Sequence, residues 1–141
     1  MNDIEFSTGI GAVEYTEKSL KDYYFKKRYQ RYEPGVPLVA ALDSIELPMK
    51  IAVLSAKQCP KCITAIPMLL RAYFECDNPK IEIRFFDADS DTLPDELKGI
   101  VAPHFKGYDV SFQPVFTITG DEAAHDLENA LLHDLCLPQS L

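Results

Sequence analysis

The fold is decided by residues 49–74, which read MKIAVLSAKQCPKCITAIPMLLRAYF. The segment opens on an apolar run, residues 49–55, whose length and composition predict a buried β-strand. It closes on residues 63–74, which predict an α-helix. Cys59 and Cys62 lie between them, at the turn from strand to helix. A cysteine pair in this position is typical of thiol redox chemistry, whereas the same pair in a loop hairpin would favour zinc.

The composition limits the kind of protein that the chain can be. It has 141 residues, 47% of them hydrophobic and 26% charged, which predicts one globular domain with a substantial core. The formal net charge of −8 disfavours nucleic acid and anionic membranes as partners. No stretch reaches the roughly 20 apolar residues of a membrane span, and the start lacks the pattern of a secretory signal. Because the cysteines are too few for a disulfide scaffold, the expected location is the cytoplasm, where thiols are normally reduced.

The first part of the chain, residues 1–48, is expected to form an arm and a helical extension that packs on the domain. Residues 1–15 show no clear period and predict a loosely held arm. Thr16 is expected to cap a helix over residues 17–32, whose acidic start and basic end suit the helix dipole. A second, short helix is expected over residues 37–45.

Beyond the thiol pair, strand and helix patterns alternate along the chain. Residues 81–86 and 114–119 predict strands, whereas residues 93–105 and 121–135 predict helices. Strands that are joined through helices run parallel, with right-handed crossovers. Residues 49–141 therefore predict an α/β domain whose sheet is covered on both faces.

The position of the two cysteines gives each of them an expected role. A helix N-terminus carries unpaired N–H groups and a partial positive charge, and both stabilise a thiolate. Cys59 is therefore the expected nucleophile. Cys62, one turn further on, is expected to resolve the mixed disulfide that Cys59 forms. Pro60 suits an early helical position, and Lys61 adds positive charge that favours the thiolate.

Residues 50–135 resemble the thioredoxin superfamily. The first feature shared with it is the motif CPKC at residues 59–62, between a strand and a helix. The second is Pro67 inside that helix, and the third is a strand with an acidic turn at residues 81–87. The fourth is FQPVF at residues 112–116, which resembles the family's cis-proline segment. The helical preface and the IPMLLR sequence after the thiols are also similar to one thioredoxin-like subfamily.

The resemblance implies a thioredoxin-like fold, with a central mixed sheet flanked by helices, and a thiol–disulfide oxidoreductase. It also implies a cis bond between Gln113 and Pro114 beside the thiols. Pro114 would then shape the substrate groove, while the Gln113 backbone would pair with an extended substrate. Pro60 and Lys61 are the other expected substrate contacts. The implied partners are protein disulfides and an electron donor that the sequence does not identify, and no cofactor is expected.

The sequence departs from the family pattern at several places. Gln58 stands where thioredoxins have tryptophan, and Val53 where they often keep a buried acid. The Gly-Gly signature with which glutaredoxins bind glutathione is missing after the third predicted strand, and the strand that usually follows as a hairpin is not predicted. Neither glutathione nor a thioredoxin reductase is therefore assigned as the electron donor.

Two other functions remain open at this point. A zinc site would need two ligands besides Cys59 and Cys62. Cys76 would lie roughly 25 Å from Cys59 along a helix, at about 1.5 Å per residue; it and Cys136 are expected to be small buried hydrophobic residues. The histidines show no metal-site spacing and are expected at surface or capping positions: His104, His125 and His133. The other possibility is a protein-binding module that docks a partner through its helical preface without redox turnover.

Overall fold

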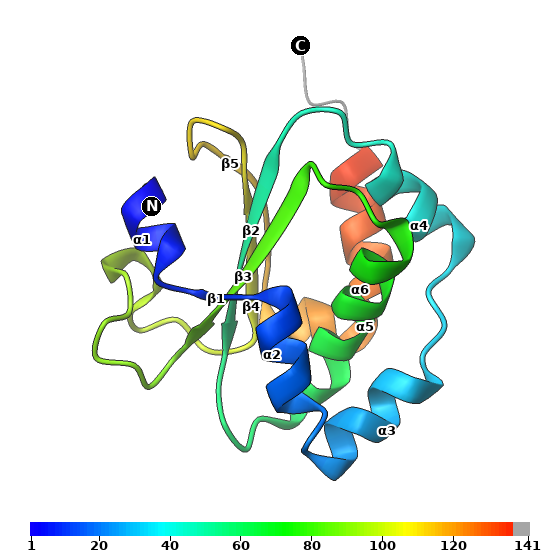
Figure 1. The fold of residues 1–141 in the computed structure, drawn as a ribbon, viewed down its shortest axis with the longest axis horizontal. Coiled ribbons are helices and arrows are strands. Elements are labelled where there is room, and N and C mark those ends of the chain that lie inside the picture. Colours follow the sequence, from blue (N-terminus) through cyan, green and yellow to red (C-terminus); the bar gives the residue numbers. More distant parts are fainter. Residues whose placement is uncertain (137–141) are drawn as a thin grey trace.

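A mixed sheet of five strands forms the centre of the computed structural model, which describes residues 1–136 (Figure 1). Its strands lie in the order β1-β3-β2-β4-β5. Their bounds are β1 Ile10–Gly11, β2 Met49–Ser55, β3 Ile81–Asp87, β4 His104–Tyr108 and β5 Pro114–Ile118. β2 and β3 run parallel, and the other neighbouring pairs are antiparallel. The expected α/β class with a mixed sheet is confirmed.

Helices flank this sheet. Their bounds are α1 Asp3–Ser7, α2 Ala12–Ser19, α3 Tyr23–Arg31, α4 Val36–Asp43, α5 Pro60–Cys76 and α6 Gly120–Cys136, with a short 3-10 turn at Asp95–Leu97. α5 and α6 pack together on one face, α3 and α4 contact α5, and α1 lies on the opposite side of the sheet (Figure 1). None of the helices within residues 1–136 is both long and apolar enough to cross a membrane.

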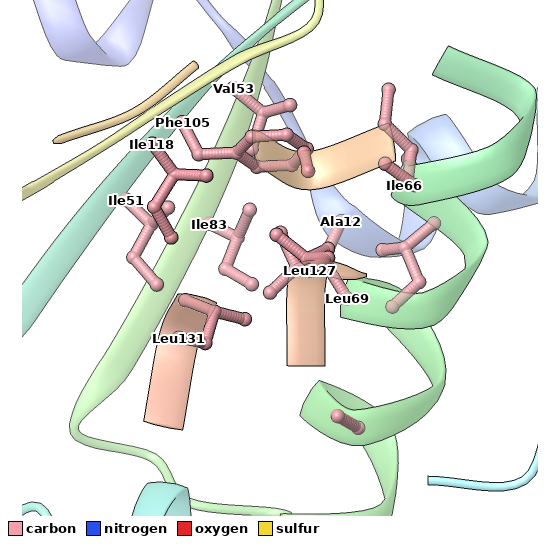
Figure 2. Close-up of a cluster of buried hydrophobic side chains, with 14 of the residues drawn as sticks. Ala12, Ile51, Val53, Ile66, Leu69, Ile83, Phe105, Ile118, Leu127 and Leu131 are labelled. Carbon is pink, nitrogen blue, oxygen red and sulfur yellow. The ribbon is translucent and has the colours of Figure 1, made fainter. Parts of the chain in front are cut away.

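The central strand β2 buries side chains on both of its faces. Ile51 and Val53 belong to the main cluster under α5 and α6, where they meet Ile83 and Phe105 (Figure 2). Ala52 and Leu54 alternate with them and join a second cluster on the opposite face, around Phe6, Phe86, Leu97 and Tyr108. This double burial explains why the strand is a continuous apolar run, and each large side chain buried in it contributes about 1.5–3 kcal/mol.

The prediction of a loose arm over residues 1–15 is wrong, because α1 and β1 lie against the sheet. α1 places Phe6 in the second cluster, where only 2% of it is exposed. Ile10 and Gly11 then pair with Phe85 and Arg84 at the edge of β3. The elements in this stretch are too short to show a period in the sequence, and tertiary contacts order them instead.

The single helix expected over residues 17–32 is divided in two. Thr16 lies buried inside α2, where its hydroxyl donates to the Ala12 carbonyl at 2.7 Å instead of capping a helix. Asp22 performs the capping, because its carboxylate accepts the Phe25 N–H at 2.9 Å and starts α3. The short helix α4 is close to the expected residues 37–45.

The prediction of a helix over residues 93–105 is also wrong. The structure has only the Asp95–Leu97 turn there, followed by β4. β4 and β5 form an antiparallel hairpin, in which Phe105 pairs with Ile118 and Tyr108 with Pro114. A hairpin is therefore present, but its unpredicted strand, β4, precedes β5 in the chain instead of following it. α5 and α6 are close to their expected bounds, and α5 continues through the buried Pro67.

Candidate functional site: the thiol pair

The two cysteines lie where β2 ends and α5 begins. Cys59 is the N-cap of α5, and its Sγ accepts the backbone N–H of Cys62 at 3.2 Å. The two residues form a disulfide, with their Cα atoms 5.2 Å apart. Cys59 is half-buried, whereas only 4% of Cys62 is exposed. A molecule that approaches from solvent therefore reaches the Cys59 sulfur first.

The residues between the cysteines are exposed, and one of them connects the starts of two helices. Lys61 forms an ion pair with Asp121 in the first turn of α6. The hydrogen bond and the charge of Lys61 lower the pKa of the Asp121 carboxyl. This contact neutralises part of the positive charge that Lys61 was expected to offer the thiolate. Pro60, at the first position of α5, keeps its ring at the surface beside Cys59.

The backbone before β4 forms the other side of the thiol pair. The carbonyl oxygen of Ala102 lies 3.7 Å from the Cys59 sulfur. Pro103 is buried against the start of α6, where a Cβ on Gly120 would lie only 2.9 Å from the Pro103 carbonyl oxygen. Val101, which precedes Ala102 in the chain, is 82% exposed. The segment 101–103 thus places one main-chain carbonyl beside Cys59.

The prediction that Gln113 and Pro114 lie beside the thiols is wrong. Within residues 1–136, the cis peptide bond joins Ala102 to Pro103 instead of Gln113 to Pro114. Pro114 pairs with Tyr108, and Tyr108 pairs with Lys50 at the start of β2. The thiols follow the other end of β2, about 16 Å away at about 3.3 Å per residue. Pro114 and Gln113 therefore cannot shape the groove at the thiols.

The physical reason for this error lies in the hairpin. Gln113 belongs to the turn between β4 and β5, where its N–H donates to the Asp109 carboxylate at 2.9 Å. A proline opens β5, as the sequence showed, but the hairpin reverses the chain and puts that end away from the site. The missed signal is Pro103 itself, which immediately precedes β4 and was assigned to a helix instead.

His104 follows this proline and is buried, not at the surface as expected. Only 9% of it is exposed, and its Nδ1 has no hydrogen-bond partner among the described residues. Burial lowers the pKa of the imidazole, and the charge of Lys106 adds to this effect. His104 therefore stays neutral in the folded protein near pH 7.

A cavity of about 740 Å³ opens on the β3 side of the thiol pair. Cys59 and Cys62 form one wall together with residues 55–58, which run from the end of β2 toward α5. The end of β3 forms another wall with three residues that follow it, Ser90, Thr92 and Leu93. The remaining wall comes from the N-terminal extension, and its residues are Thr8, Ile10, Tyr15, Lys18, Ser19, Asp22 and Phe25. The thiol pair therefore lies between this cavity and the segment 101–103.

Tyr15 fixes the extension to the domain at this cavity. Its ring stacks on Phe85, with the ring centres 3.8 Å apart and the planes within 9°. Burial raises the pKa of the Tyr15 phenol, and hydrogen bonding with the Ser55 and Ser19 hydroxyls partly offsets this rise. Ser55 is the last residue of β2. The sequence alone gave no indication of this contact, because Tyr15 fell in the expected loose arm.

The other cysteines and the possible metal ligands lie apart from this site. Cys76 is 7% exposed, and its thiol donates to the Tyr73 carbonyl at 3.1 Å, which agrees with the expected small buried residue. Burial raises the pKa of this thiol. The side chain of Cys136 falls outside the described residues. Within the described part of the chain, no group of three or more His, Cys, Asp or Glu side chains is arranged to hold a metal ion.

Two solved structures share this fold. A crystal structure of an HIV epitope-scaffold aligns with a TM-score of 0.67 and 17% identity, over 94% of this chain and 91% of that one. A protein of unknown function from Pseudomonas aeruginosa aligns with a TM-score of 0.53 and 19% identity, over 94% of this chain and 84% of that one. At these identities the likeness shows the fold alone. No family model and no curated protein sequence matches the chain.

Proposed function

We propose that this protein is a thioredoxin-like thiol–disulfide oxidoreductase in which Cys59 attacks and Cys62 resolves. The observation that carries this proposal is the unequal exposure of a bonded cysteine pair at a helix N-cap. Cys59 is half-buried and accepts the Cys62 N–H, while Cys62 is 4% exposed. The N-cap position favours a thiolate at Cys59, and the shielded sulfur is placed for the second, intramolecular step.

The reaction would proceed in two exchanges. The Cys59 thiolate attacks one sulfur of a substrate disulfide and releases the other as a thiolate, which takes up a proton. Cys62 then loses its proton and attacks the Cys59 sulfur, which frees the second substrate thiol and forms the Cys59–Cys62 disulfide. An external dithiol must reduce this disulfide before the next turnover. Such a cycle requires a compartment that keeps thiols reduced, such as the cytoplasm.

The proposed contacts for a protein disulfide surround Cys59. Pro60 and Lys61 are exposed on one side of it. The Ala102 carbonyl lies on the other, and Val101, the residue before Ala102, is exposed. These two segments would hold an extended substrate across the Cys59 sulfur, in the way that an edge strand accepts a peptide.

Trapping of the mixed disulfide tests this proposal. In Cys62→Ser the second exchange cannot occur, so a peptide disulfide should remain covalently bound to Cys59, as mass spectrometry of the intact protein would show. Cys76→Ala keeps both reacting sulfurs and should trap nothing. Equal trapping in a Cys59→Ser, Cys62→Ser double variant would contradict the proposal. Non-covalent capture of a partner that survives loss of both cysteines would favour the binding module instead.

A further inference from the structure

The cavity beside the thiol pair has the form of a small-molecule site. Its volume of about 740 Å³ falls in the range of roughly 300–1,000 Å³ that such sites occupy. It is separate from the segment 101–103, because Ala102 and Pro103 are not among its lining residues. Both cysteines line it, including Cys62, which is otherwise shielded. A molecule bound there would lie directly against the redox pair.

The lining combines an apolar base with charges of both signs. Phe25, Phe85 and Leu93 are among its buried apolar residues. The cations that line it are Lys18 and Lys57, and the anions are Asp22 and Asp87. Lys18 and Asp22 belong to the N-terminal extension, whereas Lys57 and Asp87 belong to the domain. The cavity therefore offers two positive and two negative groups around the thiol pair.

Most of these charges are available to a ligand. Lys57 is exposed and forms no ion pair within residues 1–136, while Lys18 is paired only with Glu14, one helical turn away at the surface. Asp22 and Asp87 accept backbone N–H groups from Phe25 and Asp89, each at 2.9 Å. A carboxylate has about four acceptor positions, so each can still accept a ligand's ammonium group.

From this lining we infer that the cavity binds a small zwitterionic disulfide of the cystine type and presents it to Cys59. The inference rests on the proposed function and names a substrate class for it. The ligand's ammonium groups would meet Asp22 and Asp87, and its carboxylates Lys18 and Lys57. A purely anionic disulfide would face the two aspartates and the overall charge of −8, so it binds less well.

The chemical step is the same balanced exchange. Cys59 attacks one sulfur of the bound disulfide, and one small thiolate leaves and takes up a proton. Cys62 gives its proton to solvent and attacks Cys59, and the second small thiol leaves. The ligand gains two electrons and becomes two thiols, while the cysteine pair loses two electrons and becomes a disulfide. A dithiol reductant restores the pair.

A panel of four disulfides tests the charge requirement directly. L-cystine carries ammonium and carboxylate groups, cystamine only ammonium, dithiodipropionate only carboxylate, and hydroxyethyl disulfide neither. With rates corrected for the uncatalysed exchange, kcat/KM for L-cystine should exceed that for each of the others by about tenfold or more. Equal values in a protein that reduces insulin would overturn the inference and leave the proposed function standing.

Substitutions that remove charge but keep the local hydrogen bonds locate the site. Asp22→Asn still caps α3, and Asp87→Asn still accepts the Asp89 N–H. Each should lower the preference for L-cystine over dithiodipropionate by about tenfold, the effect of one charge-assisted hydrogen bond. Glu17→Gln and Lys21→Gln change exposed charges of the same extension outside the cavity and should leave the preference unchanged. Equal effects of all four variants would overturn the inference.

Binding without reaction separates the cavity from the redox chemistry. L-cystathionine is a zwitterionic thioether that resembles cystine and cannot be reduced. Calorimetry on the Cys59→Ser, Cys62→Ser double variant should detect its binding, weakened about tenfold by Asp22→Asn. Absence of binding to this variant and to the oxidised wild-type protein would overturn the inference, whatever the outcome with insulin.

Discussion

Cys59 is both the cap of α5 and the more exposed sulfur of its pair. These properties follow from one position, because the chain leaves β2 at Ser55 and must turn before α5 can begin. The sequence was sufficient to predict this residue and its partner Cys62, since both belong to one local strand–turn–helix pattern. It was not sufficient for Ala102, Tyr15 or His104, whose positions depend on contacts between distant segments.

His104 should make stability depend on pH in mildly acidic solution. Burial and the positive charge of Lys106 lower the pKa of His104 in the folded state. In the unfolded chain, the histidine titrates at about 6.5. Below that pH the unfolded state binds the proton more readily, so stability is retained above about pH 6.5 and is lost as the pH falls. In urea denaturation from about pH 7 to pH 5, wild type should lose more unfolding free energy than His104→Gln, by at most about 1.4 kcal/mol per pH unit. Identical slopes would contradict this account.

Among the elements, β2, β3 and α5 were predicted closely because each has a strong pattern of its own. β2 is an almost continuous apolar run of seven residues, β3 begins with alternating apolar and charged residues, and α5 is long and amphipathic. β4 was missed because Lys106 and Gly107 interrupt its short apolar pattern. Because β4 was missed, the β4–β5 hairpin was absent from the predicted fold. The same error placed Pro114, instead of Pro103, beside the thiols.

The start of α6 should be sensitive to size, because it supports the segment beside Cys59. In Gly120→Ala the new Cβ would lie 2.9 Å from the Pro103 carbonyl oxygen and 3.1 Å from its Cδ. Relief of this contact must move α6 or Pro103, so we expect a loss of about 1–3 kcal/mol of unfolding free energy together with slower disulfide reduction. Urea denaturation and insulin assays would measure the two effects.

Gly11→Ala provides the matched control for this substitution. A Cβ at Gly11 would meet nothing within 4 Å, so the cost should stay below about 1 kcal/mol, the effect of a changed helix cap. Disulfide reduction should keep its wild-type rate. If Gly120→Ala also behaved in this way, the proposed support of Pro103 by α6 would be wrong.

Considered as a whole, the molecule joins its N-terminal extension to the sheet and helices through one core. Phe25, Leu38 and Leu42 belong to the same buried cluster as β2 and α5. Asn78, after α5, donates to the carbonyls of Leu42 and Ile45, each at 2.9 Å. The extension also completes the cavity at the thiols. The sequence predicted helices in this region but could not predict which surface they would cover, because that depends on the packed sheet.

The stacking of Tyr15 on Phe85 should be the main contact that holds the extension against β3 at the cavity. Tyr15→Ala removes the ring that stacks on Phe85, and we expect a loss of about 3 kcal/mol of unfolding free energy. Tyr15→Phe keeps the ring and loses only the hydroxyl, so its cost should be about 1 kcal/mol. Denaturation curves of the two variants measure the difference, and equal losses would show that the stacked ring does not hold the extension.

Insulin reduction with a dithiol donor is the most direct test of the central claim, that Cys59 and Cys62 are a working redox pair. Wild-type protein should accelerate the reduction, and Cys59→Ser should lose that acceleration completely. Cys76→Ala, which changes a buried cysteine outside the site, should keep the wild-type rate. A Cys59→Ser variant that reduces insulin as fast as wild type would contradict the account.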